Sequence, residues 1–338
     1  MKAAVMKDRR KMVIEETPAP KAGPGEVVLK MKYVGICGSD LHLYTTGLVP
    51  PDTIMGHECA GIVAEVGDGV EGWKIGDRVG IHGGLYCGKC FWCRRGQTNL
   101  CREVGGIGLG DMPGGYAEYL KVFPSMLLPV PEKMRLRDVA LLDPFSTAFH
   151  AVRLSGFQIA DTVLIMGAGP IGLCALQQLK LAGAKVVCVT ERVEARARAA
   201  KAFGADLVLD PTDDVSGKLA DLTDGVGVDF VFECVGIPDT TQEAFNLVRR
   251  AGKVVLVGVC MDLATVHPVL WVINEISMQA TIGFVREDLL SSMKQIEKGV
   301  LRTDGLVTET ISIEQLPDAF ERLLSPNNEI KVLVEFAD

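Results

Sequence analysis

The sequence predicts an α/β protein with two domains: a barrel-like, all-β domain and a doubly wound parallel sheet of six strands. Two observations support this prediction. The chain has 338 residues, which is more than a single hydrophobic core usually serves. Its pattern also changes near residue 160, from short β-type runs punctuated by Gly and Pro to apolar runs that alternate with helix-compatible segments.

Residues 1–150 are expected to form the all-β domain. Runs such as residues 27–31 and 60–66 are short and β-branched, and turn residues follow at 67–69 and 76–77. Short strands separated by tight turns are typical of a barrel-like sheet.

The second half contains apolar runs that are nearly continuous rather than alternating. Strands of this kind are buried on both faces, and helices between them indicate a parallel, doubly wound sheet of the type that binds dinucleotides. The six runs are residues 163–166, 186–189, 207–209, 230–232, 254–257 and 278–282.

The C-terminal segment predicts a helix over residues 287–298, a second near 314–324 and a last strand at 332–334. We expect this segment to rejoin the first domain. The predicted domains are therefore residues 1–150 together with 286–338, and residues 151–285 as an insertion.

Charge and composition exclude several classes of function. The net charge of -8 provides no basic surface for nucleic acid or anionic lipid, so we expect neither partner. Residues 162–179 are uncharged, but their glycines, proline and glutamines favour a buried strand and helix over a membrane span. Ten cysteines without an export signal favour metal ligands and thiols in a reducing compartment, which predicts a cytoplasmic protein.

One cysteine cluster has the spacing Cys-x2-Cys-x2-Cys-x7-Cys, and four thiolates make a saturated tetrahedral zinc site. An iron-sulfur cluster is an alternative, because the first three cysteines have ferredoxin spacing. In bacterial ferredoxins, however, the fourth cysteine follows after three residues and precedes a proline, whereas here the gap is seven residues. Unliganded buried thiols are the other alternative. The four candidate ligands of structural zinc are Cys87, Cys90, Cys93 and Cys101.

A second set mixes sulfur, imidazole and carboxylate: Cys37 is followed twenty residues later by His57 and Glu58. Zinc held by mixed ligands keeps an exchangeable position, at which it can lower the pKa of an alcohol oxygen. The set therefore favours zinc-assisted redox chemistry over a structural role.

A glycine-rich turn follows the first predicted strand of the second domain and precedes a helix, which is the arrangement that binds a dinucleotide pyrophosphate. Its candidate cofactor-binding residues are Gly167, Gly169, Pro170, Ile171 and Gly172. Glu191, 19 residues beyond Gly172, favours NAD over NADP because a carboxylate there accepts the ribose hydroxyls. Arg192 and Arg196 could instead pair with a 2′-phosphate, or form a solvated helix face.

Taken together, the segments Cys37-Gly38-Ser39-Asp40-Leu41-His42, Gly56-His57-Glu58 and Gly76-Asp77-Arg78-Val79, the four-cysteine cluster and the glycine-rich turn resemble the zinc-dependent medium-chain alcohol and polyol dehydrogenases. These include sorbitol, butanediol and threonine dehydrogenases. The resemblance covers essentially the whole chain. It implies a GroES-like catalytic domain with an inserted Rossmann domain, two zinc ions per chain and NAD.

The resemblance also implies roles for single residues. Cys37 and His57 correspond to zinc ligands, and Glu58 to a direct or exchangeable ligand. Asp143 occupies the remaining ligand position, where polyol dehydrogenases usually have Glu. Aspartate is one methylene shorter than glutamate, so it either ligates zinc directly or reaches it through a water molecule. Alternatively, Asp143 only anchors the turn before Pro144.

Ser39 resembles the hydroxyl that takes the substrate proton, and His42 the relay that passes it to solvent. The expected reaction is hydride transfer between NAD and a secondary alcohol, with a polyol or vicinal diol as the small-molecule substrate. L-threonine 3-dehydrogenase is an alternative, and a non-catalytic zinc and nucleotide-binding scaffold is an alternative of another class. The sixth strand of the parallel sheet, residues 278–282, would expose a sheet edge, which favours a homodimer or homotetramer.

Overall fold

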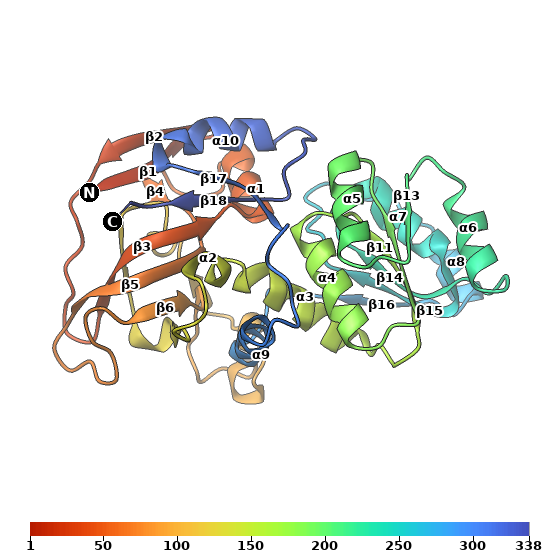
Figure 1. The fold of residues 1–338 in the computed structure, drawn as a ribbon, viewed down its shortest axis with the longest axis horizontal. Coiled ribbons are helices and arrows are strands. Elements are labelled where there is room, and N and C mark those ends of the chain that lie inside the picture. The colour runs from red at the N-terminus through yellow and green to blue at the C-terminus, as the bar shows by residue number, and fades with distance from the viewer. Residues whose placement is uncertain (338) are drawn as a thin grey trace.

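The computed structural model describes residues 1–337, arranged as two lobes side by side (Figure 1). In the view of Figure 1 the all-β lobe lies on the left and carries both ends of the chain. The lobe with the parallel sheet lies on the right, and α3 and α9 lie between them.

The all-β lobe contains a sheet in the order β10-β6-β5-β3-β18-β17, a three-stranded sheet β2-β1-β4 and the hairpin β7-β8. β9 adds to the large sheet through β3. The strands are β1 Lys2–Asp8, β2 Lys11–Glu16, β3 Val27–Gly35, β4 Thr53–Ile54, β5 Glu58–Val66, β6 Arg78–Ile81, β7 Gly84–Leu85, β8 Gly105–Gly106, β9 Tyr119–Val122, β10 Leu127–Pro129, β17 Val307–Ile311 and β18 Lys331–Glu335.

β3 is the central strand of this lobe. It pairs antiparallel with β5 along one edge, and β9 and β18 share its other edge. The pairing with β18 shows that the end of the chain returns to the all-β lobe. The domain boundaries at 150 and 286 stay a prediction, and residue 150 lies inside α3.

The second lobe has the predicted six-stranded sheet, and its strands are all parallel in the order β13-β12-β11-β14-β15-β16. This order reverses between β11 and β14, as it does in dinucleotide-binding sheets. The predicted fold class is confirmed. The strands are β11 Thr162–Met166, β12 Val186–Thr190, β13 Leu207–Leu209, β14 Val228–Glu233, β15 Val248–Leu256 and β16 Ser277–Ala280.

Helices cover the parallel sheet and connect the lobes. The α-helices are α1 Gly38–Thr46, α2 Leu136–Val139, α3 Leu142–Ser155, α4 Pro170–Leu181, α5 Glu194–Ala202, α6 Val215–Leu222, α7 Pro238–Leu247, α8 Pro268–Ile273, α9 Arg286–Glu297 and α10 Leu316–Leu323. Short 3-10 turns are η1 Cys93–Arg95, η2 Thr98–Leu100, η3 Pro124–Met126 and η4 Ile313–Gln315. Among residues 1–337, no helix has both the length and the apolar content needed to cross a bilayer.

One hydrophobic cluster extends from one lobe into the other. It includes Phe145 of α3, Ile165 of β11, Leu289 of α9 and Leu333 of β18, all of them buried. Because these side chains pack in one core, the relative position of the two lobes is fixed by that packing, in which α3 takes part.

Candidate functional site

The mixed metal-ligand set is assembled where β3 ends and β5 begins. Cys37 is the N-cap residue of α1, directly after β3, while His57 immediately precedes β5 and Glu58 begins it. The β3–β5 register places Gly35 opposite Glu58, so the two ligand-bearing segments are neighbours. One ligand atom from each of Cys37, His57 and Glu58 lies within 4.8 Å of the others.

Asp40 orients the His57 imidazole. Its Oδ1 lies 3.3 Å from His57 Nδ1, and its Oδ2 accepts hydrogen bonds from the Cys37 amide at 3.0 Å and the Tyr116 hydroxyl at 2.8 Å. Burial alone would raise the pKa of Asp40, but the imidazole and the two donors lower it below its ordinary value. With Nδ1 turned toward Asp40, the other ring nitrogen, Nε2, is available to a metal.

Lys331, which the sequence reasoning missed, neutralises Glu58. Its Nζ donates at 2.7 Å to both carboxylate oxygens of Glu58 and at 2.9 Å to the Ile36 carbonyl. Both side chains are buried, and Glu58 raises the pKa of Lys331 although burial alone would lower it. A single cation inside the apolar run 330–334 was the available signal, because a buried lysine requires a buried acid.

The other predicted residues of this site lie around the three-ligand set. Ser39 Oγ is 3.5 Å from His57 Nε2, and His42 follows three residues later in α1, partly buried. Asp143 is in the first turn of α3 and does not belong to the set within 4.8 Å. Burial, with the Glu58 charge, raises the pKa of Asp143 to about 6, while His57 and Lys331 oppose that shift.

The donor atoms at the mixed site suit zinc. Thiolate, imidazole and carboxylate are the ligand types of open zinc sites. Asp40 and Cys37 raise the pKa of His57 well above its ordinary value despite burial, so the same negative charge that holds a proton there would hold a cation.

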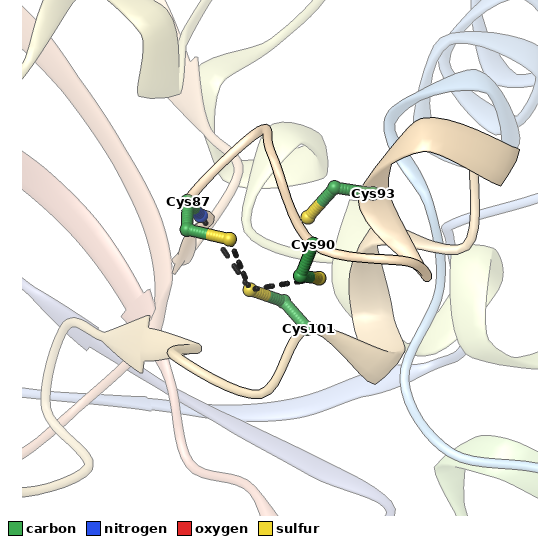
Figure 2. A group of neighbouring side chains, drawn as sticks. All are labelled: Cys87, Cys90, Cys93 and Cys101. Carbon is green, nitrogen blue, oxygen red and sulfur yellow. Dashed lines mark hydrogen bonds between the residues drawn. The ribbon is translucent and has the colours of Figure 1, made fainter.

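The four predicted structural ligands converge in the lobe between β7 and β8. Figure 2 shows the side chains of Cys87, Cys90, Cys93 and Cys101 turned toward one another. Cys101 Sγ lies 3.5 Å from Cys87 Sγ and 4.0 Å from Cys90 Sγ. Tetrahedral zinc with Zn–S bonds of about 2.3 Å separates its sulfurs by roughly 3.8 Å, so the cluster has the dimensions of a zinc site.

The glycine-rich turn connects β11 to α4. Gly167 has a φ of +91°, and a side chain at Gly172 would meet the Gly167 carbonyl at 1.9 Å, so both positions require glycine. Gly169 caps α4, with Pro170 and Ile171 in the first turn, and a Cβ at Gly169 would point into open space. A pyrophosphate can therefore approach the backbone at the N-terminus of α4.

Glu191 follows β12 directly and points toward this turn. Its Oε2 accepts from the Ala168 amide at 2.8 Å, and its Oε1 accepts from the Val193 amide at 2.8 Å. Arg192 is exposed, whereas Arg196 Nε donates at 2.8 Å to the Glu329 carbonyl. The acid is thus placed beside the glycine-rich turn, where the sequence predicted it.

The helix after the glycine-rich turn packs on the same core as the strands that carry two residues of the mixed site. Cys174 of α4 is fully buried, which raises the pKa of its thiol, and it belongs to the same hydrophobic cluster as Ala60 of β5 and Leu333 of β18. These two strands begin with Glu58 and Lys331. A reaction between a bound dinucleotide and a metal-held substrate is compatible with this arrangement.

We expect Cys90→Ser to remove one of two zinc ions and to destabilise the four-thiol lobe, because a hydroxyl is a poor substitute for a thiolate ligand. The expected drop in melting temperature is roughly 5–10 °C. Metal analysis and thermal unfolding check this, with Cys188→Ser, a buried thiol of β12, as the control for loss of a buried sulfur. Unchanged zinc content in Cys90→Ser would contradict the structural assignment.

Comparison with known proteins agrees with this geometry. The family described as "Alcohol dehydrogenase GroES-like domain" matches residues 23–132, and the family described as "Zinc-binding dehydrogenase" matches residues 170–298. A sorbitol dehydrogenase of Bacillus subtilis (strain 168) is 36% identical, with 99% of this chain and 97% of the relative covered. An L-threonine 3-dehydrogenase of Pyrococcus horikoshii is 35% identical, with 90% of each chain covered.

A solved structure shows the same fold over the whole length. The crystal structure of 2R,3R-butanediol dehydrogenase from Bacillus subtilis matches with a TM-score of 0.90 at 34% identity and covers 99% of both chains. The fold, the metal-ligand sets and these full-length similarities agree, and the chain belongs to the zinc-dependent medium-chain alcohol and polyol dehydrogenase family.

Proposed function

We propose that this enzyme oxidises a secondary alcohol, with a polyol or vicinal diol as substrate class, by transferring a hydride to NAD. The observation that carries the proposal is the set formed by Cys37, His57 and Glu58, in a lobe that shares one hydrophobic core with the helix that begins at the glycine-rich turn. The similarity to enzymes named for sorbitol and butanediol supports the substrate class.

Residues of the all-β lobe hold the catalytic metal. Cys37 and His57 are the proposed standing ligands, Glu58 a direct or exchangeable ligand, and Asp143 the remaining candidate, directly or through water. A zinc ion bound there would supply the Lewis acidity that favours loss of the alcohol proton, and NAD would supply the hydride acceptor. Asp40 keeps the His57 imidazole oriented, while Lys331 offsets the charge of Glu58.

The chain provides a route for the released proton. Ser39 Oγ, 3.5 Å from His57 Nε2, is placed to accept the proton of a substrate hydroxyl. His42 lies one helical turn further along α1, and its imidazole is the proposed group that passes the proton on to solvent.

The dinucleotide would lie along the carboxyl edge of the parallel sheet. Gly167, Gly169 and Gly172 allow the pyrophosphate to approach the N-terminus of α4, with Pro170 and Ile171 beneath it. Glu191 would accept the ribose hydroxyls, which favours NAD. Arg192 and Arg196 border the same region.

Threonine is the second candidate substrate, and the 35% identical L-threonine 3-dehydrogenase of Pyrococcus horikoshii supports it. A screen with NAD at alkaline pH should therefore include polyols, vicinal diols, simple secondary alcohols and threonine. We expect NADH absorbance to appear with a polyol or diol. Absence of NADH formation with every alcohol would favour a non-catalytic zinc and nucleotide scaffold.

The same assay tests the metal ligands. Cys37→Ser should lower kcat/KM at least about a hundredfold, because it removes a zinc ligand. Cys260→Ser should retain activity, because a hydroxyl can replace the thiol that donates to the Asp262 carbonyl. Equal activities of the two variants would contradict the role of Cys37.

Glu191→Ala should raise the KM for NAD by roughly tenfold to a hundredfold without raising the KM for NADP, since two hydrogen bonds to a charged group are lost. Steady-state kinetics with both cofactors measure this change. Glu194→Ala, an exposed acid three residues away, is the control. An unchanged NAD to NADP preference would refute the ribose assignment.

We also infer a homo-oligomer and a cytoplasmic location. β16 is the edge strand of the parallel sheet, and apolar side chains on it and on α8 are exposed, including Val272 at 75% and Ile273 at 66%. A second copy of this chain paired along β16 would cover them. All ten cysteines are free thiols, which supports a reducing compartment.

The wild-type protein should elute as a dimer or tetramer in gel filtration, and Ile273→Asp should shift it toward the monomer by placing a charge in the interface. Ile159→Asp, at an 81% exposed isoleucine outside this surface, should elute like the wild type. A monomeric wild type would remove the proposed assembly.

A further inference from the structure

We propose that Tyr116 is a positioning residue for the mixed metal centre, acting through Asp40 on the His57 imidazole. The inference rests on the proposed function, because it requires a metal at Cys37 and His57. No feature of the sequence pattern singled out Tyr116, which lies in the irregular segment before β9.

The Tyr116 side chain contacts both ligand-bearing segments. It is fully buried, and its hydroxyl lies 2.8 Å from Asp40 Oδ2 and 3.1 Å from the Gly35 carbonyl, at the end of the strand that leads to Cys37. Its ring faces Gly56, where a Cβ would lie 2.9 Å from the ring carbons. Gly56 immediately precedes His57, so one aromatic side chain fixes the spacing between the two segments.

The hydrogen bonds of Asp40 show what the hydroxyl contributes. Oδ2 accepts from the Cys37 amide and from Tyr116, which leaves Oδ1 facing His57 Nδ1 at 3.3 Å. Two donors on Oδ2 fix the orientation of the Asp40 carboxylate. That orientation determines which nitrogen of the His57 imidazole carries the proton. Without the hydroxyl, the carboxylate can rotate and Nε2 is no longer held ready for the metal.

The chain offers a matched control in Tyr44. Its ring also packs edge-on against Phe320, with centroids 5.2 Å apart compared with 5.9 Å for Tyr116. Its hydroxyl also donates to a carboxylate, Glu321, at 2.7 Å. Tyr44→Phe therefore removes a comparable hydrogen bond from the same lobe, and this hydrogen bond does not involve Asp40.

The test measures zinc affinity as well as turnover. Apo-protein is titrated with zinc against a chromophoric chelator, and Cys37→Ser gives the signal of the four-thiol site alone. Tyr116→Phe should weaken zinc binding at the mixed site by about tenfold to a hundredfold, a typical cost of losing an outer hydrogen bond to a metal ligand. It should lower kcat/KM for the alcohol while the KM for NAD stays unchanged. Tyr44→Phe should change zinc affinity less than twofold.

Wild-type zinc affinity and kcat/KM in Tyr116→Phe would overturn the inference while the proposed function stands. If the wild type itself binds zinc only at the four-thiol site, as Cys37→Ser does, the proposed function fails and the inference fails with it.

A double-variant cycle tests whether the effect passes through Asp40. In an Asp40→Ala background, adding Tyr116→Phe should change zinc affinity less than twofold, since the partner of the hydroxyl is already absent. A further loss of tenfold or more in that background would show a direct structural effect and overturn the positioning role.

Discussion

The antiparallel register of β3 and β5 is the constraint on which the rest of the site depends. Gly35 lies opposite Glu58, so the segment leaving β3 and the segment entering β5 meet at one end of the sheet. A Cβ at Gly35 would lie 1.9 Å from Glu58 Oε2, so only glycine leaves room for that carboxylate. This pairing makes neighbours of Cys37 and His57, which are twenty residues apart in sequence.

The site is also a balanced arrangement of buried charge. Asp40 and Glu58 are nearly inaccessible to solvent, and each faces a cationic or protonatable partner: His57 for Asp40 and Lys331 for Glu58. Burying an unpaired carboxylate would lower the stability of the fold, whereas a paired carboxylate keeps its charge and can attract a metal ion. Lys331 comes from the last strand, so the electrostatics of the site depend on the return of the chain to the all-β lobe.

Helix α3 connects the two lobes and packs against both of them. Asp143 lies in its first turn, and its buried side chains share one core with β11 and α9. The helix that follows the glycine-rich turn is packed on this same core, together with β5 and β18, which carry Glu58 and Lys331. Membership of the zinc-dependent dehydrogenase family accounts for this arrangement, in which the metal lobe and the nucleotide lobe contribute to one reaction.

The sequence by itself determined the local features. Apolar runs predicted all six parallel strands. Strands buried on both faces need no alternation, and β16, which is mostly exposed, was found because it too is largely apolar in sequence. The spacings of cysteines and glycines predicted both ligand sets and the nucleotide turn. The exact ends of strands differed, as β15 begins at Val248, six residues before the predicted run, because its first part is paired but more exposed.

Only the tertiary structure decided which distant residues complete the site. Tyr116 and Lys331 lie 76 and 273 residues from their partners Asp40 and Glu58, and no period or spacing links them. Likewise, the length of the Asp143 side chain was known from the sequence, but its place outside the three-ligand set depends on how α3 packs. Such contacts follow from strand pairing and helix packing between remote segments, which a local pattern does not contain.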